Sequence, residues 1–199
     1  MRSIREAYDH LSPGYETRWR KYIRRSVDET LARADIRSGE RVLDIGCGTG
    51  TLLHEIVRSV RPVRAVGVDL SFGMIARARL CGASLLAGDA ESLPLRSASF
   101  DLVITTSSFH FWRHPKLGLQ EVRRVLNKSG RLVITDWCDD FVACRLCNAF
   151  LRIRDASHQR IFSKSECVAM LEESGFRVLQ IDDYKISWLW GLMTAVARC

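Results

Sequence analysis

Alternating glycines follow an acid at the end of one apolar segment, a pattern that can bind a ligand through the backbone. The residues concerned are Asp44, Gly46, Gly48 and Gly50. Because glycine tolerates positive φ and has no Cβ, this spacing predicts a buried strand that turns sharply into a helix and leaves room for a ligand against the main chain. Such a turn serves dinucleotides, phosphates and other adenosine ligands alike, so by itself it does not choose among them.

Two further acids follow apolar runs. Asp69 ends the run 63–68, roughly 20 residues after the glycines, where a ribose diol would be held. Asp89 follows the short apolar segment 84–87. The carboxyl ends of parallel strands meet at one edge of a sheet, so we expect the three acids to gather there. Three acids suit a ligand that is cationic and rich in hydrogen-bond donors.

The elements that position these acids alternate along the chain. We predict strands at 42–45, 63–68, 84–87, 100–106 and 130–136, and helices at 49–58, 71–80 and 115–126. This alternation implies a parallel sheet with right-handed crossovers. A turn is expected at 127–130.

The C-terminal part of the chain has its own signals. Ser163 and Glu166 have capping-box spacing, which predicts a helix that stops at 174–175. The tail 176–198 is expected to form two strands, joined as a hairpin through Ser187.

Several motifs in this order resemble those of class I S-adenosylmethionine-dependent methyltransferases, of the small-molecule type related to ubiquinone and phospholipid methylating enzymes. They lie at 42–50, 66–71, 88–95, 100–112 and 121–136. The resemblance implies an α/β fold with a Rossmann-like, seven-stranded, mostly parallel sheet, helices on both faces and one antiparallel strand near the C-terminus. A dinucleotide oxidoreductase is disfavoured, because Thr51 stands where the third glycine of its motif belongs.

The resemblance also implies which residues bind the cofactor, S-adenosyl-L-methionine. Asp44 and the turn of Gly46 and Gly48 would meet the amino end of the methionine moiety, with Thr105 and Thr106 nearby. Asp69 would hold the ribose hydroxyls and Asp89 the adenine amino group. The adenine would lie between Leu70 and Ala90. Tyr8 and Tyr15 are candidates for a lid over the cofactor, or for simple packing.

Methyl transfer is an in-line displacement that needs alignment and exclusion of water, and many such sites have no dedicated base. If one acts here, His110 is the first candidate, because it follows the strand 100–106 in a substrate-facing loop and imidazole titrates near neutrality. The alternative is that His110 only holds that loop. Asp136 and His158 are the next candidates.

The acceptor is expected to be a small molecule, with a lipid headgroup or a quinone-like aromatic as the leading possibilities. An aromatic or apolar wall would suit it, and the segment 137–162 is the expected pocket region. The predicted pocket residues are Phe109, Trp112, Asp136, Trp137 and His158, with Phe111 beside them.

The helix expected at 15–34 has an apolar stripe and a strongly basic face. It could lie on an anionic membrane, or it could pack on the domain with its charges in water. The segment 1–34 is interpreted as lid and helix within one methyltransferase domain spanning 1–199. No oligomeric state follows from the sequence.

Composition limits the remaining classes. The net charge of +7 favours anionic surroundings, yet no nucleic-acid module is recognisable, so no nucleic-acid partner is expected. Nucleic-acid or protein methylation and a non-catalytic cofactor-binding role stay as alternatives. Seven cysteines and a charged N-terminus without an apolar leader favour reduced thiols and a cytoplasmic location. Cys138, Cys144 and Cys147 could bind a soft metal, but we expect them to pack, and no metal site is predicted.

Overall fold

The computed structural model describes residues 3–60, 63–78, 82–154 and 160–199. Its strands form a seven-stranded sheet in the order β3-β2-β1-β4-β5-β7-β6. They are β1 (Arg41–Ile45), β2 (Arg64–Asp69), β3 (Ser84–Ala87), β4 (Phe100–Thr106), β5 (Leu126–Trp137), β6 (Arg177–Lys185) and β7 (Gly191–Arg198). Strands β1 to β5 pair in parallel, whereas β7 runs antiparallel to both β5 and β6. The expected sheet with one antiparallel strand is confirmed.

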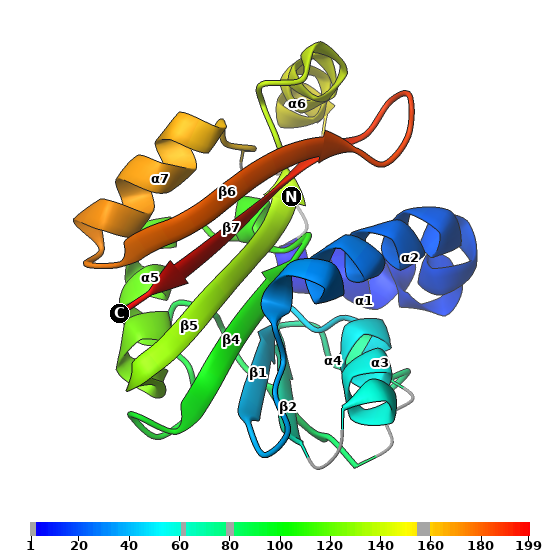
Figure 1. Cartoon of the computed structure of the whole chain (residues 1–199). Coiled ribbons are helices and arrows are strands. Elements are labelled where there is room, and N and C mark those ends of the chain that lie inside the picture. The colour runs from blue at the N-terminus through cyan, green and yellow to red at the C-terminus, as the bar shows by residue number, and fades with distance from the viewer. Residues whose placement is uncertain (1–2, 61–62, 79–81, 155–159) are drawn as a thin grey trace.

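Helices cover both faces of this sheet. They are α1 (Ile4–Leu11), α2 (Tyr15–Ala34), α3 (Thr51–Ser59), α4 (Phe72–Ile75), α5 (Pro115–Val125), α6 (Val142–Arg154) and α7 (Lys164–Glu173), with 3₁₀ turns η1 (Ser12–Gly14) and η2 (Phe109–Phe111). Figure 1 shows α5 and α7 on one face, α2 and α3 on the other, and α6 beyond the end of the sheet where β5 finishes.

The core is split by the sheet into two layers. Leu102 and Ile104 of β4 face α2 and α3, while Val103 between them faces α5 and α7. This alternation follows from the two-residue period of a strand, and residues on both faces are apolar because both faces are covered. Burial on both sides explains why the strands appear in the sequence as nearly continuous apolar runs.

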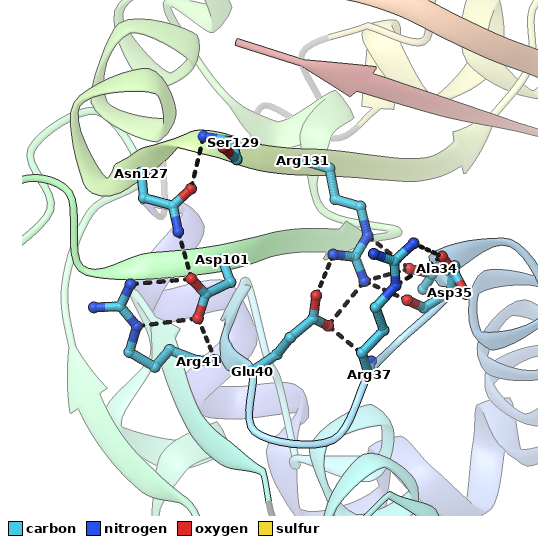
Figure 2. A network of polar contacts seen from close by, with 9 residues as sticks. All are labelled: Ala34, Asp35, Arg37, Glu40, Arg41, Asp101, Asn127, Ser129 and Arg131. Carbon is cyan, nitrogen blue, oxygen red and sulfur yellow. Dashed lines mark hydrogen bonds and ion pairs between the residues drawn. The ribbon is translucent and has the colours of Figure 1, made fainter.

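A polar network fixes the far end of α2 to the sheet (Figure 2). The Arg131 guanidinium of β5 donates to the Ala34 carbonyl at 2.9 and 3.0 Å and pairs with Glu40 at 2.5 Å. It therefore satisfies a carbonyl that the helix end leaves without an intrahelical partner. Beside it, Asp101 holds Arg41 and Asn127. This anchoring orients α2 so that its first half lies near the carboxyl ends of the strands.

Several predicted elements are confirmed. The helix 15–34 and the strands 84–87 and 100–106 have the expected bounds. Ser163 and Glu166 form a capping box at the start of α7. The hairpin of β6 and β7 turns through Ser187, whose hydroxyl accepts from the Leu189 and Trp190 amides.

Two predictions need correction, and one helix was missed. The segment 127–130 is not a turn before a strand: it lies inside β5 as an irregularity in the pairing with β4, where the Asn127 side chain bonds Asp101 and Ser129. The helix from Ser71 does not continue to residue 78. After Ile75 the backbone forms tighter turns, in which the amides of Arg77 and Ala78 donate to carbonyls only three residues earlier in the chain. Residues 79–80 lie outside the described part. Helix α1 was not predicted, although Ser3 and Glu6 form a capping box that could have revealed it.

Candidate active site

The glycine turn connects β1 to α3 with a backbone that only glycine adopts freely. Gly46, Gly48 and Gly50 have φ of 74°, 54° and 79°. The Gly46 amide donates to the Val68 carbonyl at 2.7 Å, which ties the turn to β2. A Cβ on Gly46 would lie 2.0 Å from the Ser108 hydroxyl, so the loop after β4 presses directly on this turn. At Gly46 the missing Cβ makes room for the Ser108 side chain, whereas a Cβ on Gly48 would meet nothing within 4 Å.

Asp69 organises the end of β2. Its carboxylate accepts from the Gly48 amide and from the Ser71 amide, each at 2.8 Å. Burial raises the pKa of Asp69, and the two backbone hydrogen bonds oppose this effect. The N-cap of α4 is Ser71, so Asp69 does not serve as that helix cap. Asp69 lines the cavity described below, where a hydroxyl-rich ligand would meet it.

Asp44 and Thr105 are polar side chains buried at the carboxyl ends of β1 and β4. Asp44 is 1% exposed, and burial, reinforced by the charge of Asp69, raises its pKa to about 8. Among the described residues, neither Asp44 Oδ1 nor Thr105 Oγ1 has a hydrogen-bond partner. A buried carboxyl with an unsatisfied oxygen is costly by itself, and a cationic, donor-rich ligand would relieve that cost.

A cavity of about 850 Å³ opens beside the glycine turn. Pockets for cofactors commonly measure about 300–1,000 Å³, so this volume suits a nucleoside-sized ligand. Eight predicted site residues line it, together with Tyr15: Tyr8, Gly46, Gly48, Asp69, Leu70, Asp89, Ala90 and Trp112. Asp89 is exposed at its edge, where the carboxylate accepts from the Glu91 amide at 2.9 Å.

Helix α1 borders this cavity, at the position where the sequence predicted a lid, and polar contacts hold it to the turn after β2. The Asp9 carboxylate accepts from the Ser71 hydroxyl at 2.6 Å and from the Gly73 amide at 2.7 Å. Arg5 donates to the Leu70 carbonyl at 3.1 Å. Tyr8 lies between, with its ring 5.2 Å from that of Phe111. The polar contacts of Asp9 and Arg5 were not predicted, although Asp9 stands next to Tyr8 in the sequence.

His110 and Asp136 form a buried pair behind the wall of the cavity. His110 Nδ1 lies 2.6 Å from one Asp136 oxygen, and the His110 amide donates to the other at 3.0 Å. The imidazole stacks on Trp137 at 5.2 Å. Neither His110 nor Asp136 lines the cavity, whereas Phe111 does. The sequence placed both residues near the acceptor, but their pairing emerges only from the fold.

A group of aromatic side chains, Trp19, Tyr22, Trp137 and Trp190, continues from this pair. We name it the acceptor-side aromatic group for the role proposed for it below. The Trp137 indole donates to the Tyr22 hydroxyl at 2.6 Å. The same Tyr22 hydroxyl lies 2.7 Å from the Ser107 hydroxyl. The Trp190 ring lies 4.4 Å from Trp137, 5.8 Å from Tyr22 and 6.4 Å from Trp19. Tyr22 and Trp190 were not among the pocket residues predicted from the sequence. The signal available was the aromatic pair at 188 and 190 in a hairpin turn.

The remaining predicted residues lie elsewhere. Phe109 is fully buried and packs on Trp112 and Phe162 in the core, away from the cavity lining. His158 lies outside the described residues. Cys138 and Cys144 are buried, and no group of three metal-ligating side chains gathers within the part of the chain that the structure describes.

Comparison with known proteins adds an independent finding. The family described as "Methyltransferase domain" matches residues 43–134, which run from β1 into β5. A demethylmenaquinone methyltransferase of Thermotoga maritima is 34% identical over 139 residues, covering 67% of this chain and 58% of the relative. The 2-methyl-6-phytyl-1,4-hydroquinone methyltransferase 2 of Oryza sativa is 36% identical over 129 residues, covering 62% of this chain and 35% of the relative. The chain thus spans between a third and three fifths of these relatives.

A solved structure shows the same fold over nearly the whole chain. A chain in the complex between the Haloferax volcanii Trm112 methyltransferase activator and a methyltransferase superposes with a TM-score of 0.84. It covers 98% of this chain and 97% of that chain at 19% identity. The family model and the relatives agree with the fold: the chain carries a class I S-adenosylmethionine-dependent methyltransferase domain. The resemblance stated from the motifs is confirmed, and so is its cofactor, S-adenosylmethionine.

Proposed function

We propose that the protein transfers a methyl group from S-adenosylmethionine to a small, lipophilic acceptor of the quinone or hydroquinone type. The observation that carries the proposal is the cavity between the glycine turn and the lid, with the acceptor-side aromatic group on the far side of the loop after β4. The cavity presents backbone groups and carboxylates to the cofactor, and the acceptor-side aromatic group presents flat aromatic rings to the acceptor. The cofactor supplies an electrophilic methyl group, so the chain's task is alignment and exclusion of water.

In this proposal the cofactor lies along the carboxyl ends of β1, β2 and β3. Asp69 binds the ribose hydroxyls, and Asp89 meets the adenine between Leu70 and Ala90. The amino end of the methionine moiety points to Asp44, one of whose oxygens has no partner among the described residues. A cation beside it would favour the ionised carboxylate and so offset the burial that raises the pKa of Asp44. The turn of Gly46 and Gly48 lines the pocket, whereas Asp44 and Thr105 lie buried behind that lining.

His110 is proposed as the general base for a hydroxyl acceptor. Asp136 fixes Nδ1 of the imidazole, so Nε2 is the nitrogen that would take a proton from the acceptor. The stacking of His110 on Trp137 places the imidazole beside the acceptor-side aromatic group. Phe109 supports this loop from the core, so its role in the proposal is packing, whereas Trp112, which contacts Phe109, also lines the cavity.

The acceptor class rests on the composition of the wall and on two relatives. Trp137, Trp190 and Tyr22 present aromatic rings that can stack on a flat acceptor. Two similar proteins are named as methyltransferases of demethylmenaquinone and of a phytyl hydroquinone.

We also propose a cytoplasmic location, since all six described cysteines are free.

The proposal is tested by methyl transfer. The protein is incubated with methyl-labelled S-adenosylmethionine and a panel of substituted hydroquinones, with phospholipids, tRNA and a protein extract assayed in parallel. Label in the hydroquinone product, lost on heating the protein, supports the proposal. Label confined to nucleic acid or protein would overturn the acceptor class. Cofactor binding by calorimetry without transfer to any fraction would point to the non-catalytic alternative.

A further inference from the structure

Helix α6 carries an apolar stripe on its outer side. Val142, Leu146 and Phe150 are spaced four residues apart and are 68%, 67% and 55% exposed. Residues at this spacing lie on one face of a helix. Cys144, on a different face, is buried, and its sulfur accepts from the Gly191 amide at 3.2 Å. The stripe therefore points away from the domain while the opposite side of α6 is held by β7.

The turn between β6 and β7 adds an exposed tryptophan beside this stripe. Trp188 is 86% exposed, whereas Trp190 two residues later packs on Trp137. Figure 1 shows α6 and this turn together at the end of the sheet where β5 finishes. A large ring with one polar edge is costly in water and is favoured at the boundary between lipid and water.

The first half of α2 contributes positive charge next to the same turn. Trp19 lies 6.4 Å from Trp190, which joins the helix to the hairpin. Around Trp19 the segment 15–25 contains one acid, Glu16, and five exposed cations: Arg18, Arg20, Lys21, Arg24 and Arg25. On α6 itself, the Arg145 side chain is 60% exposed between Val142 and Leu146.

We propose that this end of the molecule docks on an anionic lipid bilayer. We call the surface the docking face and define it by Val142, Leu146, Phe150, Trp188 and the five cations of α2. The apolar side chains enter the headgroup boundary while the cations meet lipid phosphates, a complementarity that an apolar patch alone would lack. No helix within the described residues is long and apolar enough to cross a bilayer, so the docking is peripheral.

Docking at this place has a consequence for the reaction, which rests on the proposed function. The docking face adjoins the acceptor-side aromatic group, because Trp190 belongs to the same turn as Trp188. A lipophilic acceptor could then pass from the bilayer to the site without crossing water.

The test is flotation of the full chain with vesicles of phosphatidylglycerol and phosphatidylcholine, against vesicles of phosphatidylcholine alone. We expect binding to the anionic vesicles only, weakened by salt. Leu146→Glu with Phe150→Glu should lower the partition coefficient by at least about tenfold. Arg20→Glu with Arg24→Glu should lower it by at least about tenfold as well, since each cation near the surface adds about fivefold.

Matched controls lie at the other end of the sheet. Leu179→Glu changes an exposed leucine near the start of β6, and Arg96→Glu with Arg177→Glu reverses two exposed cations near the starts of β4 and β6. Both controls should bind vesicles within twofold of the native chain. Equal loss in variants and controls, or no vesicle binding by the native chain, overturns the proposal. So does self-association in sedimentation that only the Leu146→Glu, Phe150→Glu variant loses, because the stripe would then join two copies.

Failure of the docking and failure of the function can be told apart. Methyl transfer to a water-dispersed hydroquinone measures the function without vesicles, and flotation measures docking without turnover. Transfer without flotation leaves the function and removes the docking, whereas flotation without transfer does the reverse.

Discussion

The cofactor half and the acceptor half of the proposed site are formed by different kinds of chemical group. The cofactor half consists of the glycine turn, Asp69 and the turn after β2, where backbone amides and carboxylates do most of the bonding. The acceptor half consists of His110, Asp136 and the acceptor-side aromatic group, where side chains from four distant segments meet. A backbone pocket depends on a short local motif, whereas a side-chain pocket depends on long-range packing. The two halves should therefore respond differently to substitution.

The largest expected effect comes from filling the space of Gly46. Gly46→Ala forces a Cβ to within 2.0 Å of the Ser108 hydroxyl at a positive φ. We expect cofactor affinity to fall by at least about a hundredfold in calorimetry, from strain and displaced backbone together. Gly39→Ala is the matched control, since Gly39 also has positive φ but its Cβ would meet nothing within 4 Å. Equal losses in both variants would mean that strain alone, and not the site, is responsible.

The acceptor half should lose turnover without losing cofactor. Because His110 is proposed as the base, His110→Gln should lower kcat by about a hundredfold and leave cofactor affinity within twofold. Asp136→Asn should lower kcat in the same direction, because Asp136 orients the imidazole. Rates are compared at saturating hydroquinone, so that kcat and KM separate. An unchanged kcat in His110→Gln would leave His110 as a residue that only holds the loop.

Substitution of Asp69 tests the cofactor half through a side chain, whereas Gly46→Ala tests it through the backbone. Asp69→Ala should weaken cofactor binding by at least about tenfold, the scale of a lost hydrogen bond to a charged group. Asp69→Asn keeps an acceptor for one of the two amides that Asp69 holds, so it separates collapse of the turn from loss of the ribose contact. Asp28→Ala, at an exposed acid on α2, is the control. Unchanged affinity in calorimetry would remove the ribose assignment.

Substitution of Trp190 tests whether the acceptor half of the site extends to the turn between β6 and β7. Trp190→Ala should raise KM for a hydroquinone by about tenfold while cofactor affinity stays constant, because it removes one ring of the aromatic group. Trp190→Phe should restore most of the loss. Trp188→Ala, two residues away on an exposed side chain, should leave KM unchanged with a water-dispersed acceptor. If both tryptophans matter equally in that assay, the turn acts by general stability.

The smallest effect is a dependence of stability on pH. Burial and the charge of Asp69 raise the pKa of Asp44 to about 8. Between about pH 4 and pH 8 the folded free protein therefore holds a proton that the unfolded chain has released, so the contribution of Asp44 to stability falls as pH rises. Asp44→Asn should raise Tm at pH 8.5 by about 2 °C or more without cofactor, and by less at pH 5. Cofactor affinity should depend on pH with the opposite sign to stability. The affinity of the native protein for the cationic cofactor should increase toward pH 8, and the affinity of Asp44→Asn should not.

Local patterns determined most of the cofactor half. The glycine spacing, the acids at strand ends and the apolar runs each act within a few residues, so the sequence alone predicted β1, β2 and β3 and eight of the residues that line the cavity. The same holds for the capping box of α7 and the hairpin through Ser187. Local signals fail where tertiary contacts compete: Asp101 draws Asn127 into β5, and the helix after Ser71 stops early.

Only the tertiary structure decided the acceptor half. His110 and Asp136 are 26 residues apart, and Tyr22 and Trp137 are 115 apart, so no spacing rule joins them. Their meeting depends on how α2 is fixed by Arg131 at one end and how the antiparallel β7 brings Trp190 back to the end of β5. The sequence by itself determined the class of cofactor pocket, because that pocket is made of local backbone. The shape offered to the acceptor follows from packing between segments far apart in the chain.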